Sequence, residues 1–377
     1  SDEVKKAYTW ENFSYSNYPN DWARVYDVIY PSNLALEGIE KIAPDAGNQV
    51  EWNNIKGSAL VFRALSFLQG AFIFCKAYDP ATSDKDPGLV LRLHSDFTAP
   101  SKRSTVGETY SQIINDLKEA APLLPQTPVH PVRPSRAAAY GLLARTYLSM
   151  REYDSCQKYA SLCLDIKHDL FDFNSITDIN ANFAFPQFNN EVIMVTVINS
   201  AVYYLISQPF TLVDSTLYSS YSDNDLRKYA FFGPTTAGYN FKGSYSGTPW
   251  ELFMGIATDE VYLMRAECYA RNGDKDAALK DLNMLLESKW KAGTFVPFEA
   301  ASATDALNLI LAERREELLF RNLRWMDIKR LNKEGANITL TRKVNGEVYT
   351  LPPNDNRYAL PIPADIINIT GIQQNAR

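Results

Sequence analysis

The sequence predicts a mostly α-helical protein, built from helix pairs of the tetratricopeptide type with long loops and a few short strands. Apolar residues recur every three or four positions over much of the 377-residue chain, which is the period of a buried helix face. Glycine supplies only 17 residues, about 4.5% against a usual ~7%. Neither G-x-G-x-x-G nor G-x-x-x-x-G-K-[ST] occurs. These observations favour helices and argue against dinucleotide-binding α/β folds.

Two helices are expected near the N-terminus, after an irregular start. Residues 1–20 are polar and aromatic without a helical period, whereas residues 22–39 have one, in two parts around Pro31. A longer helix follows over residues 53–78. Its most apolar part indicates a buried helix and not a membrane span, which needs about 20 apolar residues. Three polar residues interrupt it: Arg63, Ser66 and Gln69.

A third helix and a proline-rich linker come next. Thr105 and Glu108 form the capping box T-x-x-E, which predicts a helix that runs to about Leu124. The linker that follows is punctuated by Pro122, Pro125, Pro128, Pro131 and Pro134.

Two helix pairs then repeat one spacing of residues. In each pair, Y-x3-A-x2-Y lies on the first helix, and a turn and a second apolar helix complete the unit. The small Ala lets the two helices approach and the Tyr fills the gap one turn later, as in tetratricopeptide repeats. The positions are Tyr140, Ala144 and Tyr147 in the first pair and Tyr262, Ala266 and Tyr269 in the second.

The remaining regions have other patterns. A β-branched run over residues 191–198 predicts at least one strand. Residues 203–250 contain 12 aromatics among short polar side chains, a composition typical of loops. One charged helix is expected over residues 305–332, followed by a hairpin with a type I′ turn at Asn345-Gly346. The tail over residues 360–367 is expected to be extended.

No constellation of residues points to catalysis, a metal or a nucleic acid. The net charge of −6 gives no general attraction to nucleic acid. Residues 243–247 resemble a nucleophile elbow but have Tyr245 where the nucleophilic Ser should stand. The three histidines lack a metal-binding spacing, C-x-x-C is absent, and the four cysteines are expected to be buried free thiols. Glu313, Glu316 and Glu317 alternate with arginines and are expected to form a solvated or salt-bridged helix face. Asp223 and Asp225, next to Arg227 in a loop, are expected to form ion pairs or a turn.

Two aromatic segments, residues 8–22 and 203–250, are the predicted ligand site. Flat Tyr and Trp faces cover the C–H faces of sugar rings at little entropic cost, while Asn side chains hydrogen-bond to the hydroxyls. The competing interpretation is that each ring packs against the underside of its own loop. The predicted ligand-binding residues are Trp10, Tyr15, Tyr18, Asn20, Tyr239, Asn240, Tyr245 and Trp250.

The C-terminal part resembles the signature of the SusD/RagB family. Residues 310–330 read ILAERREELLFRNLRWMDIKR, and residues 358–367 read YALPIPADII and are followed by Gln374-Asn375. Residues 57–67, 116–125 and 133–148 are similar to earlier helices of that family. Asn322 stands where the family often has Gly, and Cys156 where it usually has Ala. The chain is short for the family, and the family's N-terminal lipid-bearing Cys is expected to lie in a start that is cut away from this sequence.

The resemblance implies a single SusD-like domain over residues 1–377. The helical-pair scaffold would occupy about 22–167 and 257–335, the loop-rich ligand-binding part about 1–21 and 168–256, and the C-terminal hairpin and tail 336–377. The resemblance places the ligand site in loops before the first conserved helix and in the central insertion, which are the two aromatic segments named above.

The resemblance also implies a function without catalysis or cofactor. Relatives are lipoproteins on the outer-membrane surface of Bacteroidota-type bacteria, held by an N-terminal lipid anchor. They bind glycan and deliver it to a SusC-like TonB-dependent transporter. Peptide binding, as in RagB-like relatives, is the first alternative. The second is a tetratricopeptide scaffold that binds a protein partner near Tyr140 and Tyr262.

Overall fold

The computed structural model describes residues 2–15, 20–198, 212–248 and 251–377. It divides into two compact units, each drawn from separate stretches of the chain. The terminal unit, which contains both chain ends, comprises Ser1–Leu124, Ser149–Arg151 and Trp325–Arg377; the central unit comprises Pro125–Leu148 and Glu152–Arg324. The mostly helical fold class is confirmed. The single domain expected over residues 1–377 stays a prediction.

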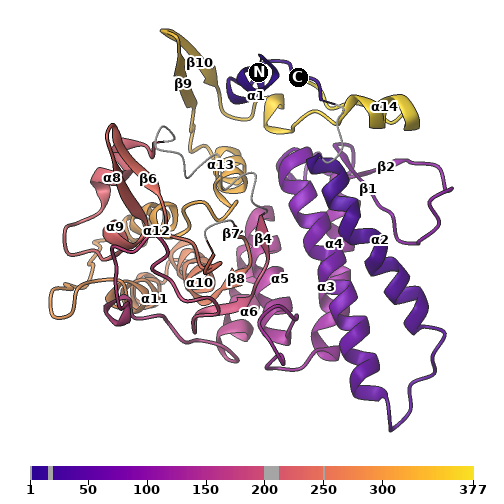
Figure 1. The fold of residues 1–377 in the computed structure, drawn as a ribbon, viewed down its shortest axis with the longest axis horizontal. Coiled ribbons are helices and arrows are strands. Elements are labelled where there is room, and N and C mark those ends of the chain that lie inside the picture. The colour runs from indigo at the N-terminus through magenta and orange to yellow at the C-terminus, as the bar shows by residue number, and fades with distance from the viewer. Residues whose placement is uncertain (1, 16–19, 199–211, 249–250) are drawn as a thin grey trace. The chain divides into compact units, whose positions relative to one another are not determined.

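Three long helices lie side by side in the terminal unit (Figure 1). Along the chain, a short helix precedes these three, and a two-stranded sheet comes between the second and the third long helix. The elements are α1 (Asp2–Tyr8), α2 (Asp21–Ile39), α3 (Gln49–Phe74), β1 (Pro87–Val90), β2 (Arg103–Thr105) and α4 (Val106–Leu123). Among the described residues only α3 is long and apolar enough to cross a membrane, and 83% of its apolar 18-residue window is buried, as in the core of a globular unit.

The helix starts agree with the sequence in part. The capping box of Thr105 and Glu108 is confirmed, with both of its hydrogen bonds present. The interruption expected at Pro31 is wrong, because α2 buries Ile29 and Leu36 on either side of the proline and packs along α3. The irregular start is also wrong, since residues 2–8 form α1. That helix buries no residue, so it leaves no apolar period in the sequence.

The C-terminal part of the terminal unit contains two helices, a hairpin and a short 3-10 turn. They are α13 (Arg324–Lys333), β9 (Leu340–Val344), β10 (Glu347–Leu351), η2 (Asn356–Tyr358) and α14 (Ala364–Thr370). The hairpin is confirmed: Val344 pairs with Glu347, and φ is 52° at Asn345 and 86° at Gly346, as a type I′ turn requires. The expected extended tail is wrong from residue 364 onward, where α14 begins.

The central unit is built around α10, which packs against three other helices (Figure 1). Both predicted helix pairs are confirmed, with turns at the expected places. The helices are α5 (Arg136–Met150) with α6 (Tyr153–Leu164), α10 (Thr258–Arg271) with α11 (Lys275–Glu287), and α12 (Ala303–Glu317).

The rest of the central unit consists of short elements that carry the aromatic segment. Its described residues form three antiparallel pairs, β3 with β8, β4 with β7 and β5 with β6, so the strand predicted over residues 191–198 is confirmed as two short ones. The elements are η1 (Phe173–Ser175), β3 (Val192–Met194), β4 (Val197–Ile198), α8 (Ser215–Ser220), α9 (Arg227–Ala230), β5 (Phe232–Thr235), β6 (Gly238–Phe241), β7 (Leu252–Phe253) and β8 (Ile256–Ala257).

The single helix expected over residues 305–332 is wrong. The chain leaves the helical path after α12 and resumes it in α13. Between them, Phe320 and Asn322 have left-handed backbones with φ of 56° and 59°. The break turns Phe320 against the Phe241 ring, 4.6 Å away between centroids, and brings Arg321 to Asp259.

Candidate functional site

Most of the described rings of the central aromatic segment face inward. Phe231, Phe232, Phe241 and Phe253 belong to one buried cluster with Phe173. For these rings the competing interpretation holds, because they pack beneath their own loops.

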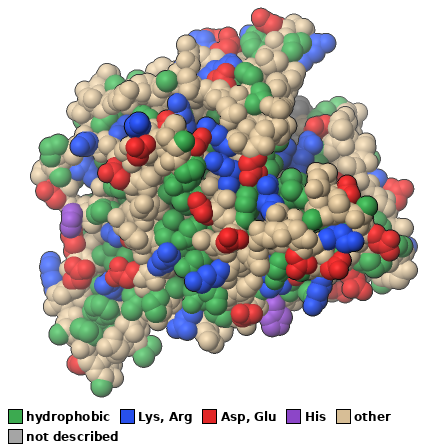
Figure 2. Space-filling model, turned by 180° about the vertical axis from the view of Figure 1, so that it is seen from behind, with side chains coloured by type: hydrophobic (Ala, Val, Ile, Leu, Met, Phe, Trp, Pro, Cys, Tyr) green, Lys and Arg blue, Asp and Glu red, His purple; other side chains and the backbone are tan. Residues whose placement is uncertain are grey.

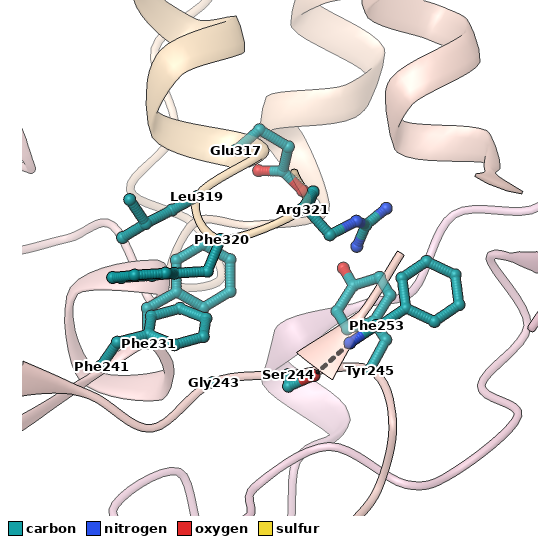
Figure 3. Close-up of a pocket in the computed structure, with 10 residues that line it drawn as sticks. All are labelled: Phe231, Phe241, Gly243, Ser244, Tyr245, Phe253, Glu317, Leu319, Phe320 and Arg321. Atoms are coloured by element: carbon teal, nitrogen blue, oxygen red, sulfur yellow. Dashed lines mark hydrogen bonds between the residues drawn. The ribbon is translucent and has the colours of Figure 1, made fainter. Parts of the chain in front are cut away.

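Tyr245 is buried as well, with 2% of its surface exposed. Its hydroxyl donates a hydrogen bond to Glu191 Oε2 (2.7 Å), and the Arg321 guanidinium lies 4.9 Å from the centre of its ring (Figure 3). Burial raises the pKa of Tyr245 well above its usual range. The exposed position expected for Tyr245 is therefore wrong.

Buried ion pairs surround Tyr245. Lys289 pairs with Glu191, and Arg321 pairs with Asp259 at 3.0 Å. The three carboxylates Glu191, Asp259 and Glu317 offer oxygens within 4.8 Å of one another, a spacing that could hold a metal ion. Because Lys289 and Arg321 already supply positive charge there, we assign the cluster to the core.

Arg227 organises a second buried group. Its guanidinium contacts Asp225 (2.6 Å), Glu313 (2.8 Å) and Glu317 (2.9 Å), which ties the loop before α9 to the last turns of α12. Ion pairs are therefore present in both acidic groups: the three glutamates pair with Arg227, which is remote in sequence, and Asp223 pairs with Lys228. Asp225, Glu313 and Glu317 are buried and Glu316 is half-buried, so the glutamates do not form a solvated helix face, whereas Asp223 is exposed.

A small cavity lies between Tyr245, Glu317 and Arg321 (Figure 3). Its size allows about one water molecule. Glu317 Oε1 and Arg321 Nε are buried there without a hydrogen-bond partner among the described residues. A cavity of this size is too small for a sugar ring.

Tyr239 has a different environment, because it stacks on Tyr218. Their ring centroids are 3.6 Å apart and the planes differ by 14°. Tyr218 lies on α8 and Tyr239 on β6, and both rings are half-buried. The backbone is fixed locally, since Val213 N–H donates to Tyr239 O (2.8 Å) and Asp214 caps α8.

Charged groups border this pair. Lys228 Nζ lies 5.3 Å from the centre of the Tyr218 ring and donates to Asp223 Oδ1 at 2.8 Å. The Asp223 side chain is 88% exposed. The hydrogen bond from Lys228 holds the pKa of Asp223 below its usual value, so the carboxylate is ionised near neutral pH. We call Tyr218, Tyr239, Asp223 and Lys228 the tyrosine platform.

Asn240, also predicted, follows Tyr239 on β6 and is half-buried. Asn240 pairs with Gly233 on β5, and its side-chain oxygen lies so close to Gly233 that a Cβ at that position would be only 2.9 Å away. Because successive side chains of a strand point to opposite faces, Asn240 lies on the face of β6 opposite Tyr239. Trp250 lies outside the described residues.

The predicted residues of the terminal unit have structural roles. Trp10 is 5% exposed and packs with Ile328 and Leu351, so its expected exposure is wrong. Asn20 is the N-cap of α2 and accepts a hydrogen bond from Ala23 N–H at 2.9 Å. Tyr15 is half-buried, and its hydroxyl donates to Pro361 O at 3.1 Å. Tyr18 lies outside the described residues.

The sequence did not single out Tyr218, Asp223 or Lys228 as ligand groups. Their only signal was membership of the aromatic-rich segment and of an acidic loop. On the face drawn in Figure 2, basic and acidic side chains are interspersed, and no basic stripe suited to a nucleic acid crosses that face. The four cysteines are buried free thiols, as expected.

Comparisons with known proteins identify relatives of the whole chain. Residues 1–148 match the family model SusD-like_3, described as "Starch-binding associating with outer membrane", and residues 242–376 match the model of the SusD family. SusD-like protein P2 of Formosa agariphila is 25% identical over 411 residues, which cover 91% of this chain and 76% of that protein.

Solved structures share the fold. A putative sugar binding protein from Bacteroides vulgatus has a TM-score of 0.77 at 21% identity, over 99% of this chain and 88% of that one. A SusD superfamily protein from Bacteroides fragilis has a TM-score of 0.78 at 21% identity, over 98% and 87%. A laminarin binding SusD-like protein has a TM-score of 0.66 at 17% identity, over 94% and 85%. The matched family models and the curated relative show that this chain belongs to the SusD/RagB family.

Proposed function

We propose that the protein binds carbohydrate at the cell surface and that the tyrosine platform contacts the sugar rings. The family description of starch binding and the fold shared with a laminarin binding protein support the ligand class. The observation that carries the placement is the partly exposed stack of Tyr218 and Tyr239 beside an ionised Asp223. A rigid aromatic face covers the C–H side of a pyranose, while the carboxylate and the Lys228 ammonium bond to its hydroxyls.

A binding assay with matched variants tests this placement. Soluble starch and laminarin are offered to the purified chain in affinity gels and by calorimetry. Tyr239→Ala removes the stacking face and is expected to weaken binding about tenfold, equivalent to about 1.4 kcal/mol. Tyr239→Phe keeps the ring and is expected to retain most of the affinity. Equal affinity of Tyr239→Ala and the parent chain would move the site away from the platform.

We further propose that the bound glycan passes to a SusC-like TonB-dependent transporter and that a lipid anchor holds the protein on the outer membrane. Family membership supports both statements. The test is to co-express the two proteins and to isolate the transporter. We expect this chain to be recovered with the transporter in a stable complex. Elution of the two proteins separately would count against delivery by direct contact.

The two alternatives make different predictions. If the protein binds peptides, we expect it to retain peptides from a mixture and to bind neither starch nor laminarin. A tetratricopeptide scaffold would need exposed repeat residues. Tyr262 is only 5% exposed and its hydroxyl donates to His168 O, while Tyr140 packs near Tyr159. These contacts favour a packing role for both rings.

A further inference from the structure

The terminal unit contains an open groove that none of the eight predicted ligand-binding residues lines, although Trp22, the last residue of the predicted segment 8–22, does. Its volume is about 470 Å³, within the ~300–1,000 Å³ usual for ligand sites. One wall is α2, the second is the chain from Val90 to Ser101, and the third is α14 with Ile372. We propose that this groove is a second carbohydrate site, which takes a short, uncharged oligosaccharide independently of the tyrosine platform. The proposal rests on the proposed carbohydrate-binding function.

Aromatic side chains of α2 give the groove a fixed floor. Trp22 packs edge-on against Phe74, with ring centroids 5.1 Å apart. The Tyr26 hydroxyl donates to Val90 O (3.0 Å) and accepts from Val90 N–H (3.2 Å), which locks the ring across the groove. Tyr30, one turn further along the helix, is 46% exposed. A sugar that stacks here would meet rings with little freedom left to lose.

The polar groups of the groove carry opposite charges. Asp27 lies on α2 between Tyr26 and Tyr30, in an exposed ion pair with Arg24 at 3.2 Å. Arg92 faces it from the second wall and donates to Ala99 O and to Ser101 Oγ. A guanidinium has five N–H donors, so these two bonds position Arg92 and leave donors for a ligand.

This balance of charge selects the class of ligand. An anionic ligand would meet Asp27 and a cationic one would meet Arg92, whereas a neutral ligand with apolar faces and hydroxyl edges fits both. A sugar has this chemistry: its C–H face suits Tyr30, and its hydroxyls can donate to the carboxylate and accept from the guanidinium.

The third wall of the groove, α14, allows ligand binding to be detected by hydrogen exchange as well as by calorimetry. α14 buries no residue, and Ile369 on it is 80% exposed. Its first residue is tied down by the bond from Ala364 N–H to Tyr15 O at 2.9 Å. Because this seven-residue helix buries no side chain, we expect it to open easily and to exchange its amide hydrogens readily. A ligand that contacts Ile366 and Thr370 is expected to slow that exchange.

The experiment uses maltoheptaose and laminarihexaose as probes of the intact chain. Calorimetry of the Tyr239→Ala variant, whose platform is expected to bind about tenfold more weakly, makes binding at the groove easier to measure. We expect residual binding by this variant, at least tenfold weaker after the additional change Tyr30→Ala. Leu34→Ala is the matched control, because Leu34 is also 46% exposed on α2 but does not line the groove. It should leave the residual affinity unchanged.

Hydrogen exchange distinguishes the remaining outcomes. Slower exchange of α14 with a probe bound to the Tyr239→Ala variant supports the groove. If the parent chain binds a probe but Tyr30→Ala changes neither affinity nor exchange, the groove proposal is overturned and the proposed function stands. If no carbohydrate binds the parent chain, both fail. Protection of α14 by a neutral peptide without any by sugar would overturn the ligand class.

Discussion

At the scale of single residues, the buried carboxylates of the central unit make stability depend on pH. Burial raises the pKa of Glu191 from 4.5 to about 7, and the nearby Asp259 and Glu317 add to this effect while Lys289 opposes it. The folded protein therefore holds a proton on Glu191 more tightly than the unfolded chain does. The stability that this proton provides is fully present below pH 4.5 and is lost as the pH rises through about 7.

Replacing this carboxyl should reduce the dependence on pH. We expect Glu191→Gln, which cannot ionise, to remove up to about 3 kcal/mol of the loss in unfolding free energy between pH 5 and 8. Part of the slope should remain, since burial also raises the pKa of Glu313 to about 7. Denaturant unfolding at several pH values measures how the unfolding free energy depends on pH. Glu51→Gln, a change at an exposed position, is the control. An unchanged slope would mean that Glu191 is ionised throughout this range.

At the scale of elements, the break between α12 and α13 explains an unusual residue of the family motif. Asn322 has a φ of 59°, in the left-handed region where Gly is unstrained and Asn is tolerated. The family often has Gly at this position, so the backbone conformation accounts for both residues. The periodic, charged sequence around it gave no sign of the turn, because Arg314 and Glu317 on one side and Arg330 on the other are all helix formers.

Two substitutions at this position test the role of the backbone. Asn322→Ala is expected to lower the free energy of unfolding by about 1–2 kcal/mol, the cost of a left-handed residue with a Cβ. Asn322→Gly should be neutral or slightly stabilising. Thermal unfolding of both variants measures the difference. If Gly destabilises as much as Ala does, the contacts of the Asn side chain, and not its φ, hold the turn.

The sequence predicted those structural features that depend on residues close together in the chain. The helix pairs, the capping box and the hairpin turn rest on neighbours within a few residues, and all three were correct. α1 and α14 were missed because they bury no residue and so leave no period. In the candidate site, composition identified Tyr239 but not its partner Tyr218, since their stacking depends on the folding of β6 beside α8. Composition also cannot tell which side of a loop a ring faces, so Trp10 and Tyr245 were misplaced.

At the scale of the whole molecule, the terminal unit needs both ends of the chain. Asn375, in the Gln374-Asn375 pair of the family motif, is buried. Its side-chain amide donates to Phe74 O (2.8 Å) at the end of α3 and to Leu360 O (2.6 Å), and its oxygen accepts from Arg103 (2.8 Å). One side chain thus joins residues that are about 300 positions apart in sequence.

Loss of this amide should therefore destabilise the whole unit. Asn375→Ala removes the amide donor of two carbonyls and one of the four acceptors of the Arg103 guanidinium, at a cost of about 2–4 kcal/mol. Thermal unfolding followed by circular dichroism measures it. Gln373→Ala, an exposed neighbour, serves as control and should unfold like the parent chain. Equal stability of the two variants would show that solvent replaces the lost bonds.

The meeting of the two chain ends has a practical consequence. Arg377 donates to the carbonyls of Trp10 and Glu11, and the two ends lie at the same side of the terminal unit (Figure 1). A tag on either end would therefore attach the protein to a sensor surface through the same edge. A short peptide could also close the ends into a ring, which makes the chain suitable for circular permutation with new ends opened in an exposed loop.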